Sequence, residues 1–206
     1  MSDTNSPDRL ILFTDAVVAI AVTLLILPLV DVVTESAAHD QNAVHVVTEH
    51  KSQIFTFLLS FVVISSFWLG HHRVFAHVRA YTAPMMLVNL LWLLAIVFLP
   101  FPTQIVGAYE SSQFTAGLYT GVILVLSITQ TWLTRMVHGH DKLENPANPV
   151  SARELTNSYL LTGLTLLAFL LAALVPGVTF YALLLLTLSP LVMRLVERVR
   201  PAQNAQ

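Results

Sequence analysis

The sequence has no cysteine and very few charged residues. The absence of cysteine excludes disulfides, thiolate metal sites and cysteine nucleophiles. Only 11% of the 206 residues are Asp, Glu, Lys or Arg, whereas a soluble globular protein has roughly 25%. The formal net charge of −2 offers no excess of basic residues for binding nucleic acid. The composition therefore argues against a soluble domain and against a nucleic-acid partner.

Long apolar segments dominate the chain instead. Apolar residues make up 55% of it, and several stretches of about twenty residues can cross a hydrocarbon core roughly 30 Å thick as helices. We therefore predict an all-α integral membrane protein, residues 1–206 forming a single domain of six transmembrane helices. The expected helices lie near 9–30, 51–78, 84–107, 114–137, 154–175 and 178–198, with polar connections at 31–50 and 138–153.

The basic residues predict the topology in the membrane. Cytoplasmic loops retain Lys and Arg, and with both termini inside, every Lys and Arg except Lys51 falls on or near the cytoplasmic side. This distribution predicts an N-in, C-in arrangement, which requires an even number of crossings. The expected location is the cell membrane, with the protein passing through the lipid bilayer several times.

The first apolar segment contains an aspartate close to its start. In a helix of 3.6 residues per turn, one face, which we call the first-helix stripe, carries Arg9, Phe13, Ala16, Ile20, Thr23, Leu24, Leu27 and Asp31. Thr14 and Asp15 point away from this stripe, toward the side that carries Val18. A carboxylate within a membrane helix costs a few kcal/mol and needs partners, so we expect Asp15 to face neighbouring helices of its own subunit.

Three segments carry distinctive motifs: RLILFTD at 9–15, SFWLGHHRVF at 66–75 and NLLWLLAIVFLPFPTQIVGAY at 89–109. Together they resemble the transmembrane-protein-175 family of potassium channels. RLILFTD at 9–15 is similar to the family's first-helix motif Arg-x-x-x-Phe-Ser-Asp, with Thr14 in place of the serine. SFWLGHHRVF at 66–75 and NLLWLLAIVFLPFPTQIVGAY at 89–109 are similar to its second and third helices. Because the three segments occur in the right order, the chain is identified as resembling the prokaryotic members, which have a single six-helix unit.

This resemblance implies a homotetramer in which the first helix lines a central pore. Ile20 matches the family's first constriction residue and Thr23 its threonine ring, while Leu24 and Leu27 would add apolar rings one and two turns further on. The implied function is passive, selective conduction of K⁺, with no enzymatic activity, no cofactor and no metal beyond the permeating ion. Asp31 is either part of an acidic outer mouth or an ordinary solvated helix end.

The resemblance also suggests how the first helix is held. The expected anchor comprises Arg9, Phe13, Thr14, Asp15, Trp68, His71, His72 and Asn89. We expect Trp68 and one of the two adjacent histidines to hydrogen-bond Asp15 or Thr14, with Asn89 also available. A metal or haem site at HHRVFAH is disfavoured, because the other histidines lie in polar loops.

A secondary transporter is the alternative function. In a proton- or ion-coupled carrier, Asp15 and His72 would form a relay. Carriers usually contain internal repeats or broken helices. The sequence has no internal repeat, and Pro28 alone is weak support for a broken helix. The channel is therefore favoured over the carrier.

Overall fold

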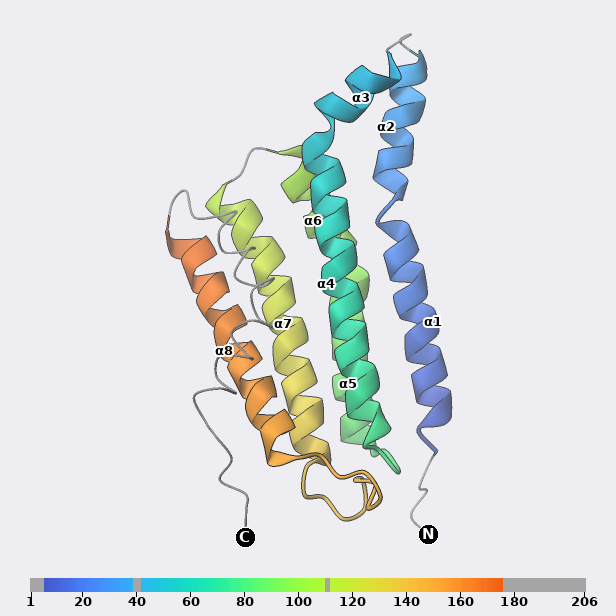
Figure 1. Cartoon of the computed structure of the whole chain (residues 1–206), viewed down its shortest axis with the longest axis vertical. Helices are drawn as coiled ribbons and strands as arrows, with labels where there is room; N and C mark the ends of the chain where they lie inside the picture. Colours follow the sequence, from blue (N-terminus) through green and yellow to red (C-terminus); the bar gives the residue numbers. More distant parts are fainter. Residues whose placement is uncertain (1–5, 39–41, 110–111, 176–206) are drawn as a thin grey trace.

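The helices form a bundle with α1 and α8 at opposite edges. The computed structural model describes residues 6–38, 42–109 and 112–175, so the helix expected near 178–198 lies outside it. The helices of this part of the chain are α1 (Asp8–Leu24), α2 (Leu27–Ala38), α3 (Ala43–Glu49), α4 (Lys51–Ala76), α5 (Ala83–Phe98), α6 (Pro100–Ala108), α7 (Gln113–Val137) and α8 (Ala152–Leu174). Figure 1 shows α1 and α2 along one edge, α7 and α8 along the other, and α4 between them.

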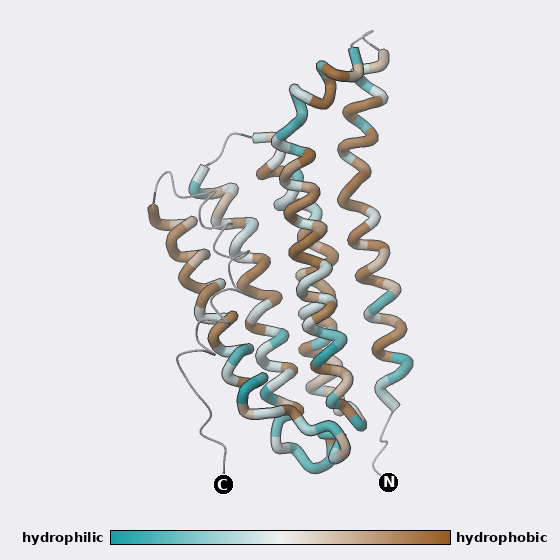
Figure 2. The backbone as a smooth tube through the Cα atoms, in the orientation of Figure 1, coloured by the Kyte–Doolittle hydropathy of each residue, from teal (hydrophilic) through white to brown (hydrophobic). Residues whose placement is uncertain are grey.

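Five helical segments are long and apolar enough to cross a membrane. The α1–α2 segment has 31 residues, α4 and the α5–α6 segment have 26 each, α7 has 25 and α8 has 23, and about 20 suffice. In Figure 2, hydrophobic residues run along these helices and hydrophilic residues gather in the loop between α7 and α8. The predicted all-α membrane fold is therefore confirmed, with five candidate spans in the described residues.

The segment expected as one helix near 9–30 is divided into two helices, α1 and α2, just after Leu24. Pro28 has no N–H group and cannot donate to the carbonyl oxygen of Leu24. The chain tightens at this point, where the N–H of Leu25 bonds to the carbonyl oxygen of Val22 at 3.3 Å, three residues back rather than four. Helix α2 then begins with Pro28 in its first turn, where a missing N–H breaks no helical bond.

The connection expected at 31–50 is mostly helical. Helix α2 continues to Ala38, and α3 covers Ala43–Glu49. Asn42 caps α3, because its side-chain oxygen accepts a hydrogen bond of 3.0 Å from the N–H of Val44. The sequence-based expectation was wrong here because it took polarity as the end of the helix, whereas a helix can continue beyond the hydrocarbon core with its polar side chains in water.

The hydrophobic core lies where α1, α4, α5 and α7 meet. Its fully buried members include Leu25 directly after α1, Ile64 of α4, Trp92 of α5 and Leu126 of α7. Helix α8 is attached outside this core, through α7. There the Thr162 hydroxyl lies 2.7 Å from that of Thr131 and 3.1 Å from that of Ser127, and hydroxyl pairs of this kind join helices within membranes.

The loop between α7 and α8 is folded against the turn between α4 and α5. The N–H of Arg79 donates to the carbonyl oxygen of Leu143 at 2.7 Å, and the N–H of Asn145 donates to that of His77 at 2.8 Å. These bonds fix the end of α7 beside the start of α5.

Candidate functional site

Helix α1 has a buried face and an exposed face. Its buried side chains are Leu10, Thr14, Val18 and Ala21, and they recur at the spacing of one helical face. Every residue of the first-helix stripe is exposed. Among its large apolar members, Ile20 is 60% exposed and Leu24 41%. The described part of the chain therefore leaves this face of α1 uncovered.

The break after Leu24 divides the first-helix stripe between two helices. The common face was deduced for an unbroken helix, but Leu27 and Asp31 belong to α2. Both residues are nevertheless exposed, as are Ile20 and Thr23 on the α1 side of the break. The Thr23 hydroxyl donates to the carbonyl oxygen of Ile20 at 2.8 Å, which leaves the lone pairs of the hydroxyl oxygen available.

The buried face of α1 is tied to α4 by a carboxylate. The indole Nε1 of Trp68 donates to Oδ1 of Asp15 at 2.8 Å. Trp68 is half-buried, and so is Asp15. A hydrogen bond to an ionised acceptor is stronger than one between neutral groups, so this contact holds the first turns of α1 against α4.

A second tie joins α1 to α5 and then to α4. The side-chain amide of Asn89 donates to the Thr14 hydroxyl at 3.0 Å, and its carbonyl oxygen lies 2.6 Å from Nε2 of His71. Because a carbonyl oxygen only accepts hydrogen bonds, His71 is the donor through Nε2. All three residues are buried. The His71 ring also stacks on Phe75 and Trp92, with ring centroids 4.3 and 4.4 Å apart.

The other members of the expected anchor lie outside this network. His72 is exposed, and its ring lies beside that of Trp68, with centroids 6.1 Å apart. Of the two histidines, His71 is therefore the one bonded to the α1 network. Arg9 and Phe13 are exposed on the stripe, and within the described residues the Arg9 side chain has no hydrogen bond or ion pair.

Sequence reasoning missed a continuation of the network into α7. The indole of Trp92 donates to Oε1 of Gln130 at 3.3 Å. Gly70 makes room for this glutamine, because a Cβ atom at residue 70 would lie 2.1 Å from Nε2 of Gln130. A glutamine in the middle of an apolar helix was the available signal, since such residues bond to neighbouring helices.

The described residues contain no group of three His, Asp or Glu side chains placed to hold a metal ion.

The arrangement at α1 combines an uncovered apolar face on one side with a dense polar attachment on the other. Such a helix is held firmly by its own subunit while presenting side chains outward.

The sequence is similar to those of known potassium channels. Residues 9–100 match the family described as "Endosomal/lysosomal potassium channel TMEM175". A potassium channel of Streptomyces collinus is 31% identical over 152 residues, 69% of this chain and 72% of that protein. A potassium channel of Chamaesiphon minutus is 30% identical over 169 residues, 80% of this chain and 83% of that protein.

The fold also matches a solved structure. The crystal structure of a lysosomal potassium-selective channel TMEM175 homolog from Chamaesiphon minutus superposes with a TM-score of 0.71 and 24% sequence identity, covering 90% of this chain and 97% of that one. At 24% identity the superposition shows only that the two proteins share a fold.

Proposed function

The chain belongs to the TMEM175 family of potassium channels, and from this membership we propose that four copies form a K⁺-selective pore with α1 at the centre. The family is one of ion channels and not of enzymes. In this proposal residues 1–206 form one domain, K⁺ is the permeant ion, and conduction is passive. The observation that carries the proposal is the exposed stripe on a helix whose opposite face is bonded to α4 and α5.

The proposed constriction consists of apolar rings. In a fourfold assembly each residue of the stripe is repeated around the axis, so Ile20, Leu24 and Leu27 would form three rings over about 10 Å of helix. Apolar rings of this kind restrict a pore by dewetting it. K⁺ holds its water less tightly than Na⁺, so a ring that removes part of the hydration shell penalises Na⁺ more. Thr23 would supply oxygens that compensate the favoured ion.

The anchor has a structural role in this proposal. A pore helix must hold its rings at a fixed radius, yet α1 contacts the other described helices on one face only. The Asp15–Trp68 bond and the Thr14–Asn89–His71 chain attach that face to two neighbouring helices. Asp15 therefore braces the pore helix and does not contact the permeating ion.

The proposed topology places both termini in the cytoplasm of a prokaryotic cell, with the protein in the plasma membrane. The placement of Lys and Arg supports it. In this orientation Asp31 and Glu35 of α2 lie at the outer end and are exposed. Four copies of each would form an acidic mouth that concentrates cations near the pore.

Reconstitution into liposomes tests the function directly. The purified protein is placed between opposed gradients of K⁺ and Na⁺, and the reversal potential of the current is measured. We expect it to lie close to the K⁺ equilibrium potential. Clear current with a reversal potential near zero would show that the protein does not select K⁺ over Na⁺. Saturable flux coupled to a proton gradient would support a carrier instead.

The carrier requires Asp15 and His72 to exchange protons. In the described residues Asp15 is bonded to Trp68, and His72 has no hydrogen bond to Asp15. This geometry favours a brace over a relay, so the carrier remains the second candidate.

A further inference from the structure

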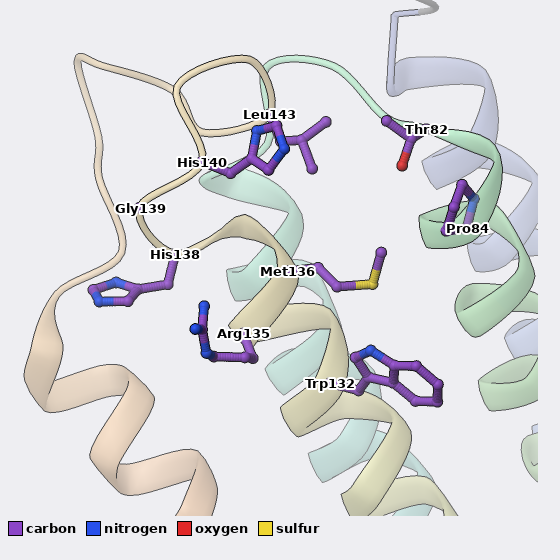
Figure 3. A pocket seen from close by; sticks show the side chains of 9 residues that line it. All are labelled: Thr82, Pro84, Trp132, Arg135, Met136, His138, Gly139, His140 and Leu143. Carbon is purple, nitrogen blue, oxygen red and sulfur yellow. The ribbon is translucent and has the colours of Figure 1, made fainter.

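A cavity unrelated to the pore stripe lies at the end of α7. It is open to the surface, has a volume of about 590 Å³ and is lined by the end of α7, the start of α5 and the loop that follows α7. Figure 3 shows Met136 and Trp132 of α7 on the side of Thr82 and Pro84, and Arg135 on the side of His138, with His140 beside Leu143. The described residues that line the cavity include no Asp or Glu.

Arg135 is the main positive charge of this cavity. It lies in the last turn of α7 and is exposed. Among the described residues it forms no hydrogen bond or ion pair. Its guanidinium group carries five N–H donors in a planar fork, a geometry that matches two oxygens of a phosphate. An anion entering the cavity would meet an arginine without a competing carboxylate.

The opposite wall also favours an anion. Thr82 immediately precedes α5, and its side chain does not cap the helix. The first N–H groups of a helix carry a partial positive charge. The start of α5 therefore adds to the potential that Arg135 creates across the cavity.

The loop contains two carboxylates. Asp141 is exposed and does not line the cavity, and Glu144 is already bonded. The two oxygens of Glu144 accept hydrogen bonds from the N–H groups of Gly139, at 3.1 Å, and Val150, at 2.7 Å. This residue fixes the shape of the loop and does not pair with Arg135. Neither carboxylate of the loop therefore lines the cavity beside Arg135.

The apolar part of the site indicates that the anion has a hydrophobic tail. Trp132 is 53% exposed beside Arg135, and such an aromatic residue is typical of the boundary between lipid and water. A second groove of about 310 Å³ shares Trp132 and Arg135 and continues between α7 and α8 past Ile128 and Tyr159. A small soluble anion would use the charged part and leave this groove empty.

We propose that this cavity binds an anionic phospholipid, with the phosphate head group on Arg135 and an acyl chain along the groove beside Trp132. Basic pockets between membrane helices are suited to such head groups. Helices α7 and α8, which form the groove, lie along the edge of the bundle opposite α1 (Figure 1), so a pore centred on α1 would lie away from the groove. The binding requires only the membrane fold, so it can be tested apart from K⁺ conduction.

Thermal stability in detergent tests the site. The full chain is purified in dodecyl maltoside, and its melting temperature is followed while phosphatidylglycerol or phosphatidylcholine is added. We expect phosphatidylglycerol to raise the melting temperature at lower concentrations than phosphatidylcholine. Arg135→Gln is expected to weaken the apparent affinity for phosphatidylglycerol about fivefold, the effect of one basic side chain near an anionic head group.

Control variants separate this site from general charge attraction. Arg73→Gln removes an exposed arginine from the last turn of α4, outside the cavity, and should leave the affinity unchanged. Arg135→Lys should retain most of it, and Trp132→Ala should weaken it by removing part of the groove. If Arg135→Gln proves unstable, the last two variants still test the site.

Several results would overturn the proposal. Equal affinities of the wild type and Arg135→Gln for phosphatidylglycerol would exclude Arg135 as the contact. Equal stabilisation by glycerol 3-phosphate, which has the head-group phosphate and no acyl chains, would identify a soluble-anion site. A change of oligomeric state in Arg135→Gln with unchanged lipid affinity would mean that a second copy of the chain covers this face.

Discussion

Helices α1 and α8 occupy equivalent positions at opposite edges of the bundle, yet they are attached in different ways. In both spans, Asp8–Ala38 and Ala152–Leu174, only 17% of the most apolar stretch is buried. Helix α8 is joined to α7 by neutral hydroxyl contacts such as Thr162–Thr131. Helix α1 is joined to two helices by a carboxylate–indole bond and a buried Thr–Asn–His chain.

Exposure alone does not distinguish a pore helix from a lipid-facing one. Both helices present large apolar side chains outward, including Ile20 of α1 and Leu170 of α8. A lipid-facing helix needs no exact position, whereas a helix that forms a constriction needs one. The costly polar attachment of α1 is therefore the feature that supports a pore role, and the following variants test it.

Removal of the α1 anchor should have the largest effect. Asn89→Leu leaves the Thr14 hydroxyl and the N–H of His71 buried without their partner, which should lower the free energy of unfolding by about 3 kcal/mol. Thr131→Val, the matched change at the α8 attachment, should cost only about 1 kcal/mol. Melting temperatures in detergent measure both. Equal shifts would contradict the claim that α1 is held more firmly than α8.

Removal of the Trp68–Asp15 hydrogen bond should have the second largest effect on stability. Trp68→Phe keeps an aromatic ring but removes the donor to Asp15, and we expect a loss of about 2 kcal/mol in stability. The neighbouring change His72→Gln should alter stability by less than about 0.5 kcal/mol, because His72 is exposed. K⁺ current through His72→Gln should also be unchanged. Loss of proton-coupled flux in that variant would instead favour the carrier.

The exposed face of α1 should control selectivity. Ile20→Asn would wet the proposed constriction, so current should rise and the K⁺ over Na⁺ permeability ratio should fall by about tenfold, equivalent to about 1.4 kcal/mol. Leu170→Asn places the same side chain on the exposed face of α8, where Leu170 is 42% exposed and Ile20 is 60% exposed. Reversal potentials measure both. The same change in both variants would show that the pore is not lined by α1.

The smallest effect should come from the outer mouth. Asp31→Asn should reduce K⁺ conductance by about twofold at low ionic strength, because the acidic ring concentrates cations there. The difference should disappear in concentrated salt, which screens the charge. Glu49→Gln, an exposed carboxylate on α3, serves as the control. A loss that persists at high salt would mean that Asp31 acts on the structure of α2 rather than through its charge.

The membrane fold could be predicted from the sequence, because length, apolarity and proline position are local properties. The spans predicted near 51–78 and 114–137 needed no tertiary information, since about 20 apolar residues suffice to cross the membrane. Pro28 indicated a disturbance in the first helix, but not that the helix would break after Leu24 and continue to Ala38. That continuation depends on whether polar residues are solvated beyond the membrane, which composition does not reveal.

The attachment of the first helix depends on tertiary packing. His71 and His72 are adjacent and chemically identical, and packing alone sets His71 between Phe75 and Trp92, where it reaches Asn89. The contact of Gly70 with Gln130 joins residues far apart in the chain, so no local pattern predicts it. A hydrogen bond between helices depends on their relative rotation and depth, and these are set by the packing of the whole bundle.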